Sequence, residues 1–210
     1  MEGNQELDLK QKVKEEKKIL REKIKNALNS MPREMAKSES EKCCSLIIES
    51  TDFKNADVVL CYMATEKEIN ADTICTETLR CGKILALPKT VPGTRLMDFY
   101  IMDGGKNLDE QILIGGWHIR EPIPTLPVFD AEKISGKNIL AIIPGVAFTN
   151  DGARLGHGKG FYDIYLKKLL SQCEKSGCAI TLTGLSFSTQ ILGTLPCSAH
   201  DVRMHKIIHV

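Results

Sequence analysis

The residues with the clearest chemical potential lie between positions 144 and 163, where glycines and charged side chains follow an apolar run. Three glycines alternate there with two basic residues: Gly156, His157, Gly158, Lys159 and Gly160. Glycine has no Cβ, so the backbone of such a segment can approach a ligand closely. Lys159 would supply a mobile ammonium and Arg154 a planar guanidinium, and both groups suit phosphate oxygens. The segment is therefore a candidate phosphate site.

The flanking elements place this segment at the end of a strand. Residues 139–143 are continuously apolar and residues 164–170 are amphipathic, so the pattern predicts strand, loop and helix. A helix beginning near Gly158 would turn its amides and the positive end of its dipole toward an anion. Asp163, close to Lys159, could then hold Mg²⁺ against a phosphate. A glycine-rich turn with an ordinary Lys159–Asp163 pair explains the same residues, and both interpretations stay open at this point.

Length and charge restrict the class of protein. A chain of 210 residues suits one α/β domain, and its formal net charge of +1 gives no support for a nucleic-acid or membrane-surface partner. No apolar run approaches membrane-spanning length and the polar start resembles no signal peptide, so we expect a cytoplasmic protein. A monomer is the expected assembly, although none of these features determines it. The eight cysteines show no Cys-x-x-Cys spacing, and we expect them to be reduced and mostly buried.

The apolar pattern predicts an α/β fold, a single domain in which a mostly parallel sheet has helices on both faces. The domain is expected to span residues 1–210, with residues 1–8 as a candidate disordered segment. Strands are expected at residues 58–63, 83–88, 97–102, 139–143, 178–187 and 206–210, and helices at residues 9–28, at 32–50, from 71 and from 158. In finer detail, Ser30 is the predicted cap of the second helix, and Pro88 is the expected end of a strand. The second helix is expected to bury Cys44, Leu46 and Ile47 or their neighbours.

Two segments resemble a known family. Pro144-Gly-x-Ala-Phe148, followed by Gly152-x-Arg-Leu-Gly-x-Gly-Lys-Gly-Phe-Tyr-Asp163, resembles the signature of the 5-formyltetrahydrofolate cyclo-ligase family, also called 5,10-methenyltetrahydrofolate synthetases. Lys17-Lys-Ile-Leu-Arg21 is similar to the element with which the family reaches the ATP phosphates. The resemblance implies that both segments bind ATP, through Lys17, Arg21, Arg154, Leu155, Gly156, His157, Gly158, Lys159, Gly160, Phe161 and Tyr162. Arg154 and Lys159 are the implied catalytic residues.

The resemblance also implies a folate site, formed by residues that follow the first core strand and by a later loop. Glu68 matches the family's glutamate that binds the folate substrate, and Tyr62 matches an aromatic residue that lines the pterin site. Trp117, the only tryptophan, lies in a segment rich in glycine and proline. An indole there could stack on the flat pterin or aminobenzoyl ring.

Asp163 and Asp201 match the acidic residues that hold Mg²⁺ in the family, and Mg²⁺ is the implied cofactor. Two positions depart from the family pattern. Phe161 stands where the family often has tyrosine, so any function of a hydroxyl group is absent there. His205 stands where another aspartate is common, and no role is assigned to it.

The implied reaction joins ATP cleavage to ring closure of 5-formyltetrahydrofolate. The formyl oxygen would attack the γ-phosphoryl group to give an imidate phosphate and ADP. N10 would then attack the activated carbon, and phosphate would depart. The product would be 5,10-methenyltetrahydrofolate. Two alternatives stay open: a non-catalytic homologue that binds folate or nucleotide, and a phosphate-binding sugar isomerase or transferase, since fold does not determine function.

Overall fold

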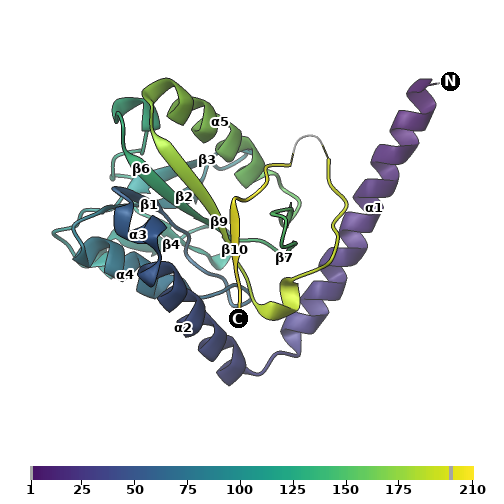
Figure 1. Cartoon of the computed structure of the whole chain (residues 1–210), viewed down its shortest axis with the longest axis horizontal. Coiled ribbons are helices and arrows are strands. Elements are labelled where there is room, and N and C mark those ends of the chain that lie inside the picture. The colour runs from purple at the N-terminus through teal and green to yellow at the C-terminus, as the bar shows by residue number, and fades with distance from the viewer. Residues whose placement is uncertain (1, 199–200) are drawn as a thin grey trace.

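A six-stranded sheet in the order β10-β9-β6-β1-β2-β3 forms the centre of the molecule (Figure 1). The computed structural model describes the backbone of residues 2–198 and 201–210, and their side chains except those of residues 2–10 and 117. The strands are β1 Val58–Leu60, β2 Ile84–Thr90, β3 Met97–Ile101, β6 Asn138–Ile143, β9 Ala179–Leu185 and β10 Lys206–Ile208. Neighbouring strands from β10 to β2 pair in parallel, and β3 runs antiparallel to β2. The predicted mostly parallel sheet is confirmed.

Helices cover both faces of this sheet. The α-helices of the described residues are α1 Glu2–Asn29, α2 Arg33–Glu49, α3 Thr51–Asn55, α4 Asp72–Arg80 and α5 Phe161–Ser176, of which α1 lies to one side. Val59 of β1 packs in one core cluster with residues of α2 and α4, whereas Val58 and Leu60 pack in another with residues of α5. Because both faces are covered, β1 and residues 139–143 of β6 are apolar throughout instead of alternating with polar residues. The predicted α/β class with helices on both faces is therefore confirmed.

Two small antiparallel sheets lie outside the central sheet. β4 Ile112–Ile114 pairs with β5 Arg120–Pro122, and β7 Ala147–Phe148 pairs with β8 Arg154–Leu155. Short 3-10 helices lie between the strands: η1 Leu108–Gln111, η2 Gly116–His118, η3 Ala131–Lys133 and η4 Ser188–Gln190. Figure 1 shows α1 running past β7 along one side of the molecule. Ile24 of α1 is buried there in a cluster with Val146 and Leu155, so α1 is fixed beside the β7–β8 sheet.

Three local predictions differ from the structure. Ser30 does not cap α2, because the N-cap position is Pro32, which has no side-chain acceptor; the Ser30 hydroxyl instead donates to the carbonyl of Asn26 at the end of α1. Cys44 and Ile47 of α2 are buried as expected, but Leu46 is 46% exposed. Pro88 does not end β2, because pairing with β1 stops at Ala86 and the strand continues beside β3. A proline is tolerated where one side of a strand has no partner.

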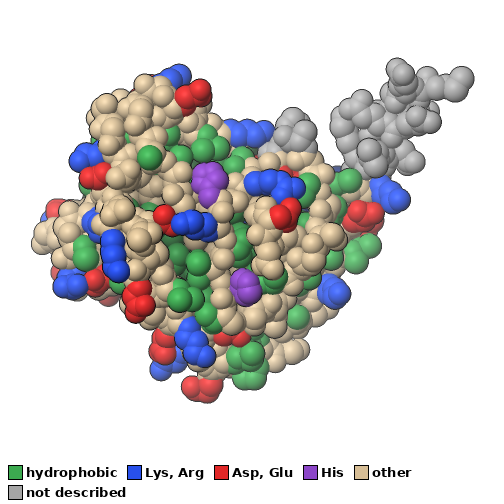
Figure 2. All heavy atoms as spheres, viewed as in Figure 1, with side chains coloured by type: hydrophobic (Ala, Val, Ile, Leu, Met, Phe, Trp, Pro, Cys, Tyr) green, Lys and Arg blue, Asp and Glu red, His purple; other side chains and the backbone are tan. Residues whose placement is uncertain are grey.

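The cysteines agree with the expectation of reduced, mostly buried thiols. All eight are free, and Cys81 and Cys197 are the exposed ones. Burial, together with the nearby Glu39 carboxylate, raises the pKa of the Cys43 thiol to about 11, so it stays protonated at neutral pH. Figure 2 shows acidic and basic side chains intermixed over one face of the molecule. None of the helices in the described part of the chain is long and apolar enough to cross a membrane.

Candidate functional site

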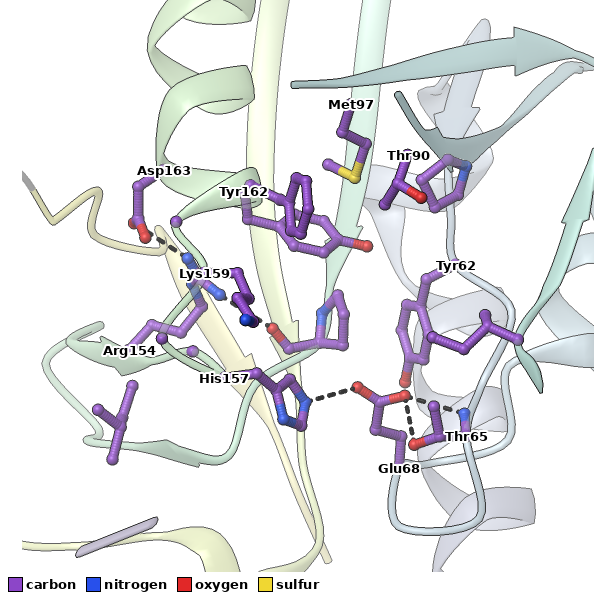
Figure 3. A pocket seen from close by; sticks show the side chains of 18 of the residues that line it. Tyr62, Thr65, Glu68, Thr90, Met97, Arg154, His157, Lys159, Tyr162 and Asp163 are labelled. Carbon is purple, nitrogen blue, oxygen red and sulfur yellow. Dashed lines mark hydrogen bonds and ion pairs between the residues drawn. The ribbon is translucent and has the colours of Figure 1, made fainter. Parts of the chain in front are cut away.

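A cavity of about 560 Å³ opens at the carboxyl ends of β1, β2 and β6, the edge of a parallel sheet where ligands usually bind. The structure brings to this one cavity every described side chain that the family resemblance implies, from positions 17 and 21, 62 and 68, 154–163 and 201. Figure 3 shows Arg154, His157, Lys159 and Asp163 on one side of it and Tyr62, Thr65 and Glu68 on the other. We call these two sides the loop wall and the carboxylate wall.

The loop wall begins at β8 and ends at the start of α5. Gly158 and Gly160 have φ angles of +91° and +79°, in the left-handed region that favours glycine. These angles delay the helix, which begins at Phe161 instead of near Gly158 as predicted. Gly160 is the N-cap residue of α5 and has no side chain that could bond to the first amides of the helix. The first turn of α5, from Phe161 to Asp163, lines the cavity. The positive end of the helix dipole therefore faces the cavity.

Arg154 is the buried cation of the loop wall, with a side chain only 3% exposed. Its Nη2 donates to Asp163 Oδ1 at 3.0 Å and its Nη1 to the Pro144 carbonyl at 3.3 Å. The guanidinium also lies 5.5 Å from the centre of the Tyr162 ring. Its Nε is buried without a hydrogen-bond partner among the residues that the structure describes. Asp163 thus pairs with Arg154 and not with Lys159, as the alternative interpretation of the loop supposed, because Lys159 precedes the helix.

Two cations of α1 reach the loop wall across a long stretch of sequence. Arg21 Nε donates to the carbonyl of Gly156 at 2.8 Å. Lys17 Nζ donates to Asp201 Oδ2 at 2.5 Å, a contact between residues 184 positions apart. Burial raises the pKa of Asp201, but hydrogen bonds from Lys17 and from the backbone of Ser198 outweigh it and leave the pKa below its ordinary value. The Asp201 carboxylate is therefore ionised at neutral pH.

The two candidate metal ligands lie on neighbouring segments. The backbone N–H of Val202, next to Asp201, donates to Asp163 Oδ1 at 3.4 Å. Among the described residues no group of three or more histidine, cysteine, aspartate or glutamate side chains is placed to hold a metal ion. Mg²⁺ is commonly bound by one or two carboxylates that share it with phosphate oxygens and water. The pair of carboxylates fits that arrangement with a bound phosphate.

Glu68 is the acidic group of the carboxylate wall. Its Oε2 accepts from the backbone N–H and the hydroxyl of Thr65, both at 2.9 Å, and its Oε1 lies 3.3 Å from His157 Nε2. Burial raises the pKa of Glu68, but the bonds from His157 and Thr65 outweigh burial and lower the pKa below its ordinary value. Tyr62 is buried beside it, and its hydroxyl donates to the Ile69 carbonyl at 2.8 Å. The wall thus presents an ionised, oriented carboxylate next to an aromatic ring.

Two predicted positions need separate mention. Trp117 lies in η2, two residues before Ile119 of the cavity lining, but its side chain is outside the described residues. His205 is not among the residues that line the cavity; its Nδ1 accepts the backbone N–H of Leu182 at 3.0 Å.

Sequence reasoning missed several lining residues, among them Thr65, Thr90 and Arg120. Thr65 follows β1 and Thr90 is the last residue of β2, so their positions at or after the ends of core strands could have indicated that they line the site. Arg120 lies in a segment without clear periodicity, and nothing in the local sequence indicated that it would face the cavity.

The fold and cavity together define an α/β protein with a candidate anion site where a strand, a glycine-rich loop and a helix meet. A family model described as the 5-formyltetrahydrofolate cyclo-ligase family matches residues 13–210, and the chain belongs to this family. It is 30% identical over 197 residues to a probable 5-formyltetrahydrofolate cyclo-ligase of Caenorhabditis elegans, covering 94% of each chain. It is 24% identical to the 5-formyltetrahydrofolate cyclo-ligase of Mus musculus, covering 94% of this chain and 95% of the mouse protein.

A solved structure agrees with the family assignment. The NMR structure of the 5,10-methenyltetrahydrofolate synthetase of Aquifex aeolicus superimposes with a TM-score of 0.72 and 26% sequence identity. The superposition covers 92% of this chain and 89% of the Aquifex chain. This relative therefore shares the fold over nearly its whole length, and the family that the sequence resemblance indicated is confirmed.

Proposed function

We propose that the protein converts 5-formyltetrahydrofolate to 5,10-methenyltetrahydrofolate while ATP is cleaved to ADP and phosphate. One observation carries the proposal: a single cavity has cations and a helix N-terminus on its loop wall and an ionised Glu68 beside Tyr62 on its carboxylate wall. The first wall suits a triphosphate and the second a flat ring with N–H donors. Two substrates bound at these walls would meet within the cavity, as a group transfer between them requires.

The proposed reaction has two steps. The formyl oxygen attacks the γ-phosphorus, so an O–P bond forms, the bond to the ADP oxygen breaks and an imidate phosphate results. N10 then attacks the activated formyl carbon and loses its proton, while the C–O bond breaks and phosphate departs. Phosphoryl transfer depends mainly on alignment and on cations that offset charge on the transferring oxygens.

Four cations of the loop wall are proposed for that role. Arg154 is buried and held by Asp163 and Pro144, so its guanidinium needs no rearrangement to stabilise developing charge. Lys159 is exposed on the glycine-rich loop, and its ammonium can follow the γ-phosphoryl group as that group moves. Lys17 and Arg21 would hold the triphosphate from α1. The loop backbone between residues 155 and 161 would complete the phosphate contacts.

The proposal includes Mg²⁺, which would offset charge on the phosphate oxygens when it is bound. Asp163 and Asp201 would hold it, because both are cavity carboxylates on neighbouring segments. In the protein alone these carboxylates pair with Arg154 and Lys17, and the two pairs orient them.

The carboxylate wall would orient the folate. Glu68 would accept hydrogen bonds from the N–H groups of the pterin, because Thr65 and His157 keep its carboxylate ionised and aimed at the cavity. Tyr62 would pack against the flat pterin, Tyr162 would pack near the nucleotide, and Trp117 is proposed as a further residue that stacks on the folate. Burial raises the pKa of Tyr162 well above its ordinary value, so its phenol stays neutral.

ADP formation tests the proposal. We expect ADP to form only when 5-formyltetrahydrofolate is present, in a one-to-one ratio with the methenyl product. Folate-independent ATP hydrolysis at the same rate would contradict it, and so would conversion of the folate without ATP.

A further inference from the structure

Arg120 is a cation that lines the cavity away from the loop wall. The remaining basic residues of the described lining lie on α1 or within positions 154–159: Lys17, Arg21, Arg154, His157 and Lys159. All of these are already assigned to the triphosphate or to Glu68. Arg120 lies instead on β5, in the β4–β5 hairpin. Its charge therefore serves neither ATP nor the pterin in the proposed function.

The hairpin holds the backbone of Arg120 in a defined position. Arg120 pairs with Ile114 across the two strands. The next residue, Glu121, is buried and tied to β2, where its Oε1 accepts from the Thr90 hydroxyl at 3.0 Å and its Oε2 from Lys89 Nζ at 3.3 Å. The Lys89 ammonium and the Thr90 hydroxyl thus compensate the Glu121 charge. Arg120 can accordingly present its charge to a ligand from a rigid strand, not from a free loop.

The guanidinium of Arg120 keeps donors available for a ligand. Its Nη2 donates to Asp72 Oδ1 at 2.7 Å, with the two side chains 33% and 37% exposed. A guanidinium has five N–H donors in a planar fork, and one such bond leaves the others free to bind a second carboxylate. Asp72 is the charged group that contacts it, and the adjacent Glu121 is itself paired with Lys89.

We propose that Arg120 binds a carboxylate of the glutamate tail of the folate substrate and selects for that tail. The proposal rests on the proposed function. With the formyl group directed to the loop wall and the pterin at Glu68, the anionic tail must leave the cavity elsewhere. Glu68 repels a carboxylate, whereas the β5 rim offers a planar cation suited to bind one.

Equilibrium dialysis with two ligands tests this inference without relying on catalysis. One ligand is 5-formyltetrahydrofolate, and the other is its tail diamide, in which both glutamate carboxylates are replaced by neutral carboxamides of nearly the same size. We expect the wild-type protein to bind the dicarboxylate about tenfold more tightly than the diamide. This ratio lies at the lower end of the range for a hydrogen bond to a charged group, because Arg120 is partly exposed. In Arg120→Gln the ratio of the two Kd values should fall close to one.

Asp72→Asn is the matched control, because it removes the same ion pair but keeps the cation. If Arg120 binds the tail, Asp72→Asn retains or increases the preference for the dicarboxylate. An equal loss of preference in both variants would mean that the pair only supports the hairpin, and would overturn the inference. A wild-type protein that binds both ligands equally, or an Arg120→Gln variant with the wild-type ratio, would also overturn it. Preferential binding without turnover would support the role of Arg120 and contradict the proposed reaction.

Discussion

Replacing Lys159 with alanine tests the function of the loop wall without disturbing the folding of the protein. Lys159 is exposed, and Asp163 pairs with Arg154 rather than with it. A lysine that donates a charge-assisted hydrogen bond to a phosphate oxygen contributes about 1.5–3 kcal/mol. Loss of that bond in the transition state lowers kcat/KM roughly 10- to 150-fold, at about 1.36 kcal/mol for each factor of ten. The effect is measured as the initial rate at which the absorbance of the methenyl product rises in the presence of Mg-ATP.

Lys167→Ala is the matched control, because Lys167 is exposed on α5 and is not among the residues that line the cavity. Both variants should unfold in urea within about 0.5 kcal/mol of the wild-type protein, as is usual for exposed substitutions. A Lys159→Ala variant with wild-type kcat/KM would refute the role of the ammonium. An equal loss in Lys167→Ala would show that the effect is not specific to the loop wall.

Three further perturbations probe packing, ionisation and the metal. Gly184→Ala should lower the free energy of unfolding by about 1–3 kcal/mol, because a Cβ there would lie 2.6 Å from the Phe148 ring and 2.7 Å from Ile207; an unchanged urea midpoint would contradict this. Glu68 contributes stability above its ordinary pKa of 4.5, and that contribution is lost as pH falls through its lower folded value. The difference in unfolding free energy between the wild-type protein and Glu68→Gln should therefore narrow in acid, and a difference that widens would argue against an ionised Glu68. Asp201→Asn should raise the Mg²⁺ concentration for half-maximal rate about tenfold; an unaltered Mg²⁺ titration would exclude Asp201 as a ligand.

The central sheet could be predicted because its strands leave a local signal. Residues 139–143 are buried on both faces, so the run is apolar without interruption. The candidate site followed from a glycine-rich segment directly after that strand, since the strand must deliver the segment to the carboxyl edge of the sheet. The wider family resemblance added positions, such as Glu68 and Asp201, that no local pattern distinguishes from solvated carboxylates.

The pairings within the site could not be predicted, because they join distant segments. Lys17 meets Asp201 only through the docking of α1 beside the β7–β8 sheet. The alternative Lys159–Asp163 pair assumed a helix from Gly158, but the left-handed Gly158 and Gly160 delay the helix to Phe161. Local spacing therefore identified the charged groups, and the tertiary fold determined which of them pair.

The same distinction explains the errors at Ser30 and Leu46. Ser30 is a good capping residue by type, but Pro32 occupies the position where α2 begins. Leu46 and Ile47 are equally apolar neighbours, and the angle at which α2 packs on the sheet decides that Ile47 is buried. Which of two neighbouring apolar residues is buried depends on the rotation of the helix about its axis, and the type of a single residue does not specify that rotation.

Near-ultraviolet absorbance of the protein mixed with 5-formyltetrahydrofolate, recorded before and after addition of Mg-ATP, tests the central claim most directly. The methenyl product is a conjugated amidinium that absorbs where the substrate does not. We predict an increase that requires both ATP and Mg²⁺ and that is abolished when either is omitted. No increase in the complete mixture, with folate still bound, would contradict the proposed reaction and favour a protein that binds folate without transforming it.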